Sequence, residues 1–409
     1  MSTADPYLIA GGGHAARRAA ETLRECDPAA RIVLIGAEPE LPYDRPVLSK
    51  DALLGDDGER RAFMRDAAWY RDRRIELRLG VRVDAIERAA RRVRLSDGSS
   101  VGYARLLIAT GSRVRHFTGP LDPDVQVHYM RTIADARALR AVLLPGKRVA
   151  VLGGGFIGLE VAASAVRLGC RVTLIEPAQR LLKRGMPEAV SAFALALHTR
   201  HGVDVRLCTL PERIRRGANG ASVVDTSMGA LDADVIVAGI GVTPNVELAT
   251  QAGLAVDDGV CVDAQCRTAD PAIFAAGEVT RHFNPLVGKP VRVESWQVAE
   301  NQPAIAAANM LGGAHTYAQW PWLWSDQYDC NLQTIGLFDS GQTLVARGAP
   351  HEHAFCVFAL NPEGRLRAAA AVNAGSEIAV CRRLMTADVK LTAAQLADRS
   401  VALRSLLPR

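Results

Sequence analysis

Apolar and polar positions follow two different patterns along the chain, and the first predicts two strand–turn–helix units. Each unit opens with a short apolar run, continues into three consecutive glycines and ends in a helix-like stretch: "YLIAGGGHAARRAAETL" at residues 7–23 and "VAVLGGGFIGLEVAASA" at residues 149–165. A second apolar run follows each helix, in "RIVLIG" and "RVTLIEP". Such alternation of strands and helices is typical of parallel sheets. The sequence therefore predicts two βαβ units.

The second pattern is strict alternation of apolar and polar residues, which predicts antiparallel strands. Residues 74–105 alternate around the turn "SDGS" and form an insertion in the first unit, after which "LLIATG" at residues 106–111 returns to the first sheet. "TADPAIFAAGEVT" adds another apolar strand to this unit, and residues 295–313 read as a helix. Beyond residue 320, further alternating runs predict an antiparallel sheet with helices near 376–385 and 392–397.

These elements predict an α/β protein with two Rossmann-like dinucleotide-binding domains and a smaller α+β C-terminal domain. The second unit is inserted into the first, so the first domain is discontinuous. The expected boundaries are 1–112 with 244–319 for the first domain, 113–243 for the second and 320–409 for the third. A chain of 409 residues is long enough for two to three domains.

The second glycine turn carries the spacing of a dinucleotide-binding fingerprint. Gly153 makes the tight bend, Gly155 lets a pyrophosphate approach the backbone, and Gly158 lets the helix pack close to the sheet. Glu176 ends the following strand 18 residues after Gly158, where an acidic residue binds the adenosine ribose.

The first turn is a weaker copy of the same fingerprint. Gly11 and Gly13 are present, Ala16 replaces the third glycine, and Glu38 follows 22 residues after Ala16. A glycine-rich turn can also be a plain connection between a strand and a helix. The acidic residue at the expected spacing favours dinucleotide binding in both units.

Composition is that of an ordinary globular protein, with 49% apolar and 23% charged residues. The N-terminus shows no signal-peptide pattern, and no apolar run reaches 18 residues, so we expect a cytoplasmic protein without a membrane partner. The eight cysteines contain no C-x-x-C pair, and no metal site is predicted. Cys261 and Cys266 have the C-x4-C spacing of disulfide reductases in the wrong part of the chain, and we expect both to be strand residues.

Positive charge gathers between Arg60 and Arg115, where fifteen arginines stand against six acidic residues. The local excess of nine positive charges is either a solvated face or a surface that steers an acidic partner. Nucleic acid is not expected, because neither interleaved aromatic residues nor a helix-turn-helix pattern accompanies the arginines.

Together, the motifs "LPYDRPVLSK", "MRTIADA", "GGGFIGLEVAASA", "DPAIFAAGEVT" and above all "PWLWSDQYDCNLQ" resemble one family. This family comprises the FAD-dependent NADH:ferredoxin reductases of bacterial ring-hydroxylating dioxygenase systems, of the biphenyl and phenylpropionate type. Putidaredoxin reductase is similar to them. The resemblance covers almost the whole chain and implies a glutathione-reductase-like arrangement with FAD on the first domain and NADH on the second.

The resemblance also implies roles for individual residues. Lys50 should lie near flavin N5, and Glu160 should pair with Lys50 and meet the nicotinamide carboxamide, which makes these two the expected catalytic residues. The expected FAD contacts are Gly11, Gly13, Ala15, Ala16, Glu38, Arg45, Lys50, Val83, Arg131, Glu278, Trp296 and Trp324. The expected NADH contacts are Gly153, Gly155, Ile157, Gly158, Glu160, Glu176, Arg184 and Gly241.

Two positions depart from the family pattern. Ala37 stands where the family has an acidic residue, so binding of the FAD ribose should fall to Glu38 or be lost. Glu278 replaces an aspartate at the position that holds the ribityl and phosphate region of FAD.

The resemblance implies that NADH delivers a hydride to FAD and that electrons then pass singly to a [2Fe–2S] ferredoxin with an acidic surface, which feeds a Rieske oxygenase or a cytochrome P450. The protein itself should be a monomer or a weak dimer. Alternatives are an NADH oxidase or reductase of quinones and other small acceptors, and a flavoprotein of the apoptosis-inducing-factor type that acts by binding partners. A disulfide reductase is excluded because "PYDRPV" lacks the dithiol.

Overall fold

The structure is a computed structural model and describes residues 5–218 and 220–408. These residues divide into two compact units, each assembled from three segments of the chain. The first unit contains the chain up to Pro46, Arg60–Arg113 and Val242–Pro321. The second contains Val47–Glu59, Val114–Gly241 and the chain from Trp322 onward. The three-domain boundaries that the sequence suggests stay a prediction.

The first unit is built on a five-stranded parallel sheet with the order β19-β7-β1-β2-β3. Its strands are β1 (Tyr7–Ala10), β2 (Ile32–Gly36), β3 (Ile75–Leu79), β7 (Arg105–Ile108) and β19 (Ile273–Ala275). Tyr7 of β1 pairs with Ile32 of β2 and with Arg105 of β7. Because these strands run in parallel and in this register, their carboxyl ends meet at one edge, where the first glycine turn begins.

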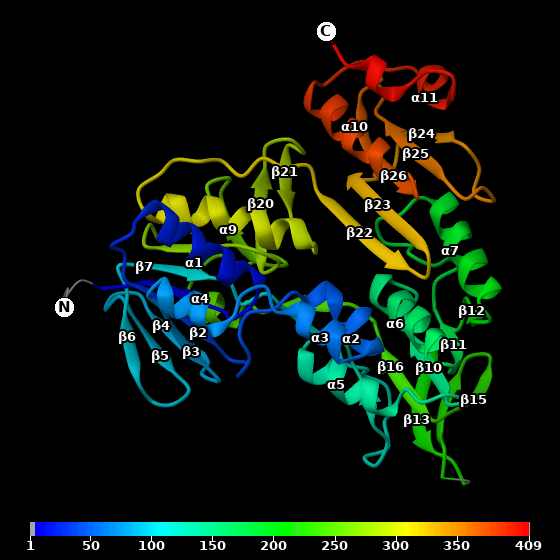
Figure 1. Cartoon of the computed structure of the whole chain (residues 1–409), viewed down its shortest axis with the longest axis horizontal. Helices are drawn as coiled ribbons and strands as arrows, with labels where there is room; N and C mark the ends of the chain where they lie inside the picture. Colours follow the sequence, from blue (N-terminus) through cyan, green and yellow to red (C-terminus); the bar gives the residue numbers. More distant parts are fainter. Residues whose placement is uncertain (1–4, 219, 409) are drawn as a thin grey trace. The chain divides into compact units, whose positions relative to one another are not determined.

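Helices α1 (His14–Cys26) and α9 (Trp296–Met310) pack against each other in the first unit (Figure 1). Their core residues are mostly small, with Ala16, Ala19 and Ala20 on α1 and Ala306 and Ala307 on α9. Alanines spaced three and four apart form one helix face and allow two helices to approach closely. The remaining helices of this unit, α4 (Ala67–Asp72) and α8 (Glu247–Gln251), are short.

Two small sheets complete the first unit. The predicted antiparallel insertion is confirmed for β4 (Val83–Glu87), β5 (Arg92–Leu95) and β6 (Ser100–Gly102). It was wrong for the first run of that stretch, because β3 pairs in parallel with β2 in the main sheet. The other sheet, in the order β18-β20-β21, consists of β18 (Val260–Val262), β20 (Thr280–Asn284) and β21 (Lys289–Val291). A two-stranded sheet pairs β8 (Ser112–Val114) with β17 (Val242–Pro244), where the chain passes between the units.

The second unit contains a parallel sheet with the order β12-β11-β10-β16-β9. Its strands are β9 (Val127–His128), β10 (Arg148–Leu152), β11 (Arg171–Ile175), β12 (Asp204–Arg206) and β16 (Val235–Ala238). The helices are α5 (Ile133–Val142), α6 (Phe156–Arg167) and α7 (Glu188–Arg200). An antiparallel sheet of β13 (Pro211–Arg216), β14 (Ser222–Thr226) and β15 (Gly229–Ala233) packs beside the parallel one.

The C-terminal part of the second unit is an antiparallel sheet with the order β22-β23-β26-β25-β24 (Figure 1). Its strands are β22 (Trp322–Gln327), β23 (Cys330–Gly336), β24 (Thr343–Arg347), β25 (Phe355–Leu360) and β26 (Leu366–Val372). Helix α10 (Gly375–Thr386) packs on β23 and β26, and α11 (Ala393–Ala397) on β24. The short helix η2 (Leu403–Leu406) follows. The predicted α/β class with two parallel sheets and an antiparallel C-terminal sheet is thus confirmed.

Three short helices lie in a region for which the sequence predicted no helix. They are η1 (Arg45–Val47), α2 (Asp51–Leu54) and α3 (Asp56–Ala62). None of the helices formed by the described residues is both long and apolar enough to cross a membrane.

The structure corrects one expectation about the cysteines. Cys261 lies in β18 as predicted, but Cys266 lies in a bend with φ 66° rather than in a strand. Both are free thiols, and burial raises the pKa of Cys266. The pair therefore offers no redox-active disulfide.

His282 is a buried histidine of β20 with an unusual environment. Neither ring nitrogen has a hydrogen-bond partner among the described residues, and the ring packs edge-on against Tyr317 at 5.1 Å. Burial lowers the pKa of His282 from 6.5 to about 4. The contribution of the neutral His282 ring to the stability of the folded protein is therefore fully present above pH 6.5. It is lost as the pH falls toward 4, because in this range the unfolded chain binds a proton at His282 and the folded protein does not.

We predict that His282→Phe raises the unfolding temperature more at pH 5 than at pH 7.5. The apolar ring takes up no proton on unfolding, so the variant avoids a loss of about 2 kcal/mol between these pH values. Calorimetry at both pH values measures the effect, with His315→Phe at an exposed position of the same unit as the control. An equal shift at both pH values would contradict the burial of a neutral ring.

Candidate functional site

The first glycine turn joins β1 to α1, and its glycines have different surroundings. Gly11 has φ 142°, and a Cβ there would lie 2.2 Å from the carbonyl oxygen of Ala109. The protein's own backbone therefore requires this glycine. Of the described residues, a Cβ on Gly13 would meet only the Arg45 guanidinium, at 4.0 Å, so the space above Gly13 is open.

The second turn, between β10 and α6, repeats this division of roles. Gly153 has φ 105° and its Cβ would lie 2.5 Å from the Gly239 oxygen, whereas a Cβ on Gly158 would lie 2.0 Å from the Gly153 oxygen. Close packing of strand and helix explains both glycines. Among the residues that the structure describes, a Cβ on Gly155 would have no neighbour within 4 Å.

The open glycines and the helix ends together fit a dinucleotide. Gly13 and Gly155 are the N-cap residues of α1 and α6, and neither helix has a side-chain cap there. The first-turn N–H groups of such a helix point outward and favour negative charge. Packing of the protein does not explain a glycine at these two positions, but the approach of a pyrophosphate does.

The predicted ribose-binding acid of the second turn is held by backbone groups. The Glu176 carboxylate accepts hydrogen bonds from the Gly154 N–H and the Ala178 N–H, both at 2.7 Å. The carboxylate is thus fixed against the glycine turn that would receive the pyrophosphate.

The corresponding acid of the first turn, Glu38, is held by side chains instead. Its carboxylate accepts hydrogen bonds from the Tyr43 hydroxyl and, at 2.7 Å, from the Arg45 guanidinium. Ala37 is exposed next to it. Burial lowers the pKa of Arg45, but its interactions with Tyr43, Glu38 and Glu278 outweigh this effect and raise the pKa overall. Arg45 therefore lies within electrostatic range of both predicted FAD acids, beside Gly13.

The segment before Glu278 also lies against the start of α1. Gly277 has φ 87°, and a Cβ there would approach the Ala15 Cβ to 3.0 Å. The Gly277 N–H donates to the Gln302 side chain of α9 at 2.8 Å. In the first unit the structure thus brings Ala15 and Glu278 to the glycine turn, whereas Val83 is a buried residue at the start of β4.

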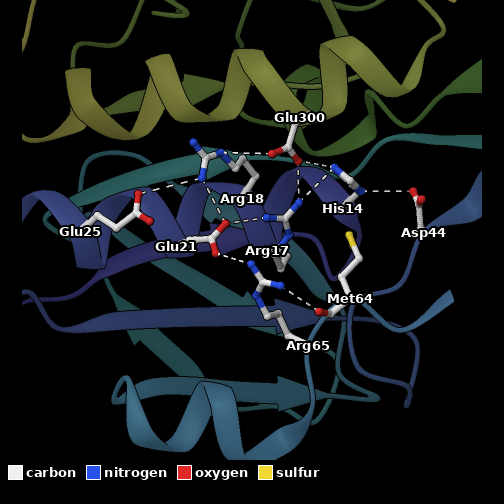
Figure 2. Close-up of polar contacts among 9 residues, drawn as sticks. All are labelled: His14, Arg17, Arg18, Glu21, Glu25, Asp44, Met64, Arg65 and Glu300. Carbon is white, nitrogen blue, oxygen red and sulfur yellow. Dashed lines mark hydrogen bonds and ion pairs between the residues drawn. The ribbon is translucent and has the colours of Figure 1, made fainter. Parts of the chain in front are cut away.

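An ionic cluster joins α1 to α9 directly behind this turn (Figure 2). His14 contacts Glu300 at 2.5 Å and Asp44 at 3.3 Å, and Arg17 bridges Glu300 and Glu21 at 2.5 and 2.6 Å. Burial lowers the pKa of His14, but its bonds to Asp44 and Glu300 raise it overall. Burial raises the pKa of Glu300, but hydrogen bonding to His14 and the charge of Arg17 prevail and bring it to about 2.

This cluster places Trp296, the first residue of α9, near the same turn. The Trp296 ring lies edge-on to the His14 ring, with centroids 5.1 Å apart. Because Ser295 caps α9 by accepting from the Val298 N–H, the helix begins at a fixed point. The predicted FAD residues of the first unit therefore gather around β1, α1 and the start of α9, apart from Val83.

In the second unit, Lys50 and Glu160 form an ion pair. The Lys50 ammonium lies 3.0 Å from Glu160 Oε2, and the Glu160 side chain is only 5% exposed. Two residues that the sequence analysis missed also hold this carboxylate: Ser49 donates to Oε2 at 2.5 Å and Ser325 to Oε1 at 2.6 Å. A buried carboxylate with these partners avoids much of the cost of desolvation.

The other predicted residues of the second unit lie at separate points of it. Arg131 precedes the Thr132 N-cap of α5, and its N–H donates to Asp135 at 3.1 Å. Trp324 of β22 stacks on Trp322 with centroids 5.0 Å apart. The remaining three are Ile157 and Arg184, which are exposed, and Gly241 with φ 102°.

The family of this chain follows from its sequence as a whole. Residues 5–303 match the pyridine nucleotide-disulphide oxidoreductase family, and residues 322–407 match the reductase C-terminal family. The chain therefore belongs to the pyridine nucleotide-disulphide oxidoreductases that carry this C-terminal domain.

Among individual relatives, the ferredoxin–NAD(+) reductase component of the anthranilate 1,2-dioxygenase system of Burkholderia cepacia is 64% identical over 99% of this chain and 100% of its own. The ferredoxin reductase structure from Rhodopseudomonas palustris is 35% identical, with a TM-score of 0.93 over 99% of this chain and 100% of its own. Putidaredoxin reductase in its covalent complex with putidaredoxin is 34% identical, with a TM-score of 0.94 over 99% and 98% of the two chains.

We predict that Gly155→Ala weakens NADH binding about tenfold or more while the fold is kept. Gly155 has extended backbone angles and an open Cβ position, so folding should change by no more than about 1 kcal/mol at this N-cap. Gly153→Ala is the matched control, because its Cβ would collide with Gly239 and lower the unfolding temperature. Titration of NADH and thermal unfolding of both variants separate the two effects. Unchanged NADH affinity in Gly155→Ala would place the pyrophosphate elsewhere.

Proposed function

We propose that this chain is an FAD-dependent NADH:ferredoxin reductase that supplies a [2Fe–2S] ferredoxin serving a Rieske oxygenase or a cytochrome P450. The observation that carries the proposal is the pair of open glycine turns, at Gly13 and Gly155, in one chain. One nucleotide can then deliver electrons that the other receives. When bound, FAD supplies the chemistry that accepts two electrons from NADH and releases them one at a time.

The residues of the first glycine turn would hold FAD. The α1 N-terminus favours the pyrophosphate, and Arg45 adds a positive charge beside Gly13. Glu38 and Glu278 would accept hydrogen bonds from hydroxyl groups of the ribose and the ribityl chain. Val83, Arg131, Trp296 and Trp324 would complete the contacts, as the family resemblance implies.

The residues of the second glycine turn would hold NADH. Gly155 and the α6 N-terminus would receive the pyrophosphate, Glu176 the adenosine ribose, and Ile157, Arg184 and Gly241 would line the site. Glu160 would orient the nicotinamide carboxamide, and its pairing with Lys50 would hold the ammonium at a fixed place near the flavin ring. A fixed positive charge there stabilises negative charge that develops during hydride transfer. Residues 1–112 with 244–319, 113–243 and 320–409 would be the FAD, NADH and C-terminal domains.

The relatives favour this function over the alternatives. The relative from Burkholderia cepacia is named as a ferredoxin–NAD(+) reductase component, and one similar structure is that of putidaredoxin reductase in complex with putidaredoxin. We further propose a cytoplasmic protein, monomeric or weakly dimeric, whose partner is an acidic ferredoxin rather than nucleic acid or membrane.

Reduction of a ferredoxin tests the function directly. The ferredoxin of an anthranilate 1,2-dioxygenase system is the first partner to try, because the relative from that system is 64% identical. The purified, FAD-loaded protein should reduce it with NADH. Rapid oxidation of NADH by oxygen alone, without reduction of any [2Fe–2S] ferredoxin, would support the oxidase alternative instead.

We predict a preference for NADH over NADPH that depends on Glu176. The fixed carboxylate would repel a 2′-phosphate by roughly 1 to 4 kcal/mol at about 4 Å, a preference of about fivefold to several hundredfold. Glu176→Ala should reduce this preference, whereas Glu188→Ala, at an exposed acid of the same unit, should not. The ratio of kcat/KM for the two coenzymes is the measurement. Equal use of both coenzymes by the parent would refute the assignment.

We predict that salt slows ferredoxin reduction more than flavin reduction. Arg92 and Arg94 of β5 are exposed, as are most arginines between Arg60 and Arg115. Raising ionic strength from about 20 to 300 mM shortens the Debye length from roughly 20 to 6 Å and screens their attraction for an acidic partner. Stopped-flow measurement of flavin reduction and of ferredoxin reduction tests whether the arginines steer the partner. If they form only a solvated face, salt should affect both half-reactions alike.

A further inference from the structure

A chain of buried hydrogen bonds leads from Glu160 into the C-terminal sheet of the second unit. Ser325 and Gln327 lie two residues apart on β22, so their side chains share one face of the strand, and both are buried. Ser325 donates to Glu160 Oε1 at 2.6 Å, and the Gln327 amide donates to Ser325 Oγ at 3.1 Å. His198 of α7 contacts the Gln327 carbonyl oxygen at 2.9 Å.

The carboxylate at the end of this chain fixes the direction of every bond in it. A carboxylate only accepts, so Ser325 uses its single proton on Glu160 and its oxygen accepts from the Gln327 amide. The Gln327 carbonyl then accepts from His198 Nε2. Burial lowers the pKa of His198 to about 4, so the ring is neutral and Nδ1 can accept from the Tyr328 hydroxyl at 3.4 Å. His201 stacks on Tyr328 with ring centroids 3.7 Å apart.

The other oxygen of Glu160 is held from a different segment. Oε2 accepts from Ser49 at 2.5 Å and lies 3.0 Å from the Lys50 ammonium. Ser164 of α6 donates to the Ser49 carbonyl oxygen at 2.8 Å, which fixes this segment to the same helix as Glu160. Each carboxylate oxygen thus has its own donors, and the plane of the carboxylate is determined by both sides.

We propose that Ser325, supported by Gln327 and His198, is a positioning residue that orients the Glu160 carboxylate toward Lys50 for hydride transfer. The inference rests on the proposed function, because it assigns Glu160 and Lys50 to the hydride step. Without the Ser325 hydroxyl, Oε1 is a buried oxygen without a donor, and the carboxylate turns toward its remaining partners. The C-terminal domain therefore contributes to the reaction with NADH. Since an amide at Gln327 does not pass protons onward, the chain orients the carboxylate and carries no proton.

The test compares Ser325→Ala, Gln327→Met and the double variant by stopped-flow reduction of the flavin by NADH. Ser325→Ala should slow the limiting rate about tenfold and Gln327→Met about threefold, because small misplacements of a positioned group are costly. The double variant should be no slower than Ser325→Ala, since Gln327 acts only through Ser325. Thr334→Val removes a buried hydroxyl of the same sheet that bonds to Ala369, and it should leave the rate unchanged.

Two further measurements separate positioning from damage to the structure. NAD+ titration of the apoprotein should give affinities for Ser325→Ala and the parent within about threefold of each other, because the pyrophosphate and ribose contacts remain. Chemically reduced Ser325→Ala should pass electrons to ferredoxin as fast as the parent. If the parent itself fails to reduce ferredoxin, the proposed function fails. If the parent reduces ferredoxin but NADH reduces the flavin of Ser325→Ala at the parent rate, the positioning role fails. The positioning role also fails if the effects of Ser325→Ala and Gln327→Met are additive.

Discussion

The second unit depends on the burial of one carboxylate, that of Glu160. A carboxylate 5% exposed is costly unless donors surround it, and here they come from two stretches of the chain: Ser49 with Lys50, and Ser325 of β22. Ser164, on the helix of Glu160 itself, donates to the Ser49 carbonyl oxygen and so holds the first stretch in place. Removing any one segment leaves a charge or a polar atom unpaired. The requirement to satisfy Glu160 therefore holds these segments together at the residue that the proposed reaction uses.

The two glycine turns are subject to a different constraint, namely how closely other groups must approach the glycine residues. Gly11 and Gly153 are required by neighbouring backbone oxygens, so they serve the fold, whereas Gly13 and Gly155 have open space in front of them. One motif thus contains both structural and binding positions, a distinction that spacing alone does not reveal. Behind the first turn, the contacts of His14 and Arg17 with Glu300 fix the helix whose N-terminus would face the FAD phosphates.

Local sequence patterns predicted the elements that depend on residues close together in the sequence. Apolar runs followed by glycine predicted both parallel sheets, and alternation of apolar and polar residues predicted the C-terminal sheet with its helices. Two glycines, Gly55 and Gly58, interrupt the helical pattern of residues 51–62, and the short helices there were missed.

Four residues of the site were missed because their importance arises only when distant segments fold together: Ser49, His198, Ser325 and Gln327. A signal did exist at Ser325 and Gln327: in "WLWSDQ" these two polar residues stand two positions apart, so a strand there places both on one face, where they need partners if buried. Cys266 was placed in a strand because its neighbours resemble one, but its positive φ belongs to a bend.

Glu160 and Lys50 are proposed to act as one unit in the hydride step. A double-mutant cycle tests it most directly, with Lys50→Met, Glu160→Gln and the double variant compared by the rate at which NADH reduces the flavin. Residues 3.0 Å apart that work together should show strong coupling, so the double variant should be no slower than the slower single variant, a departure from additivity of about 1 kcal/mol or more. Effects that simply multiply would contradict the account, because the two side chains would then contribute independently.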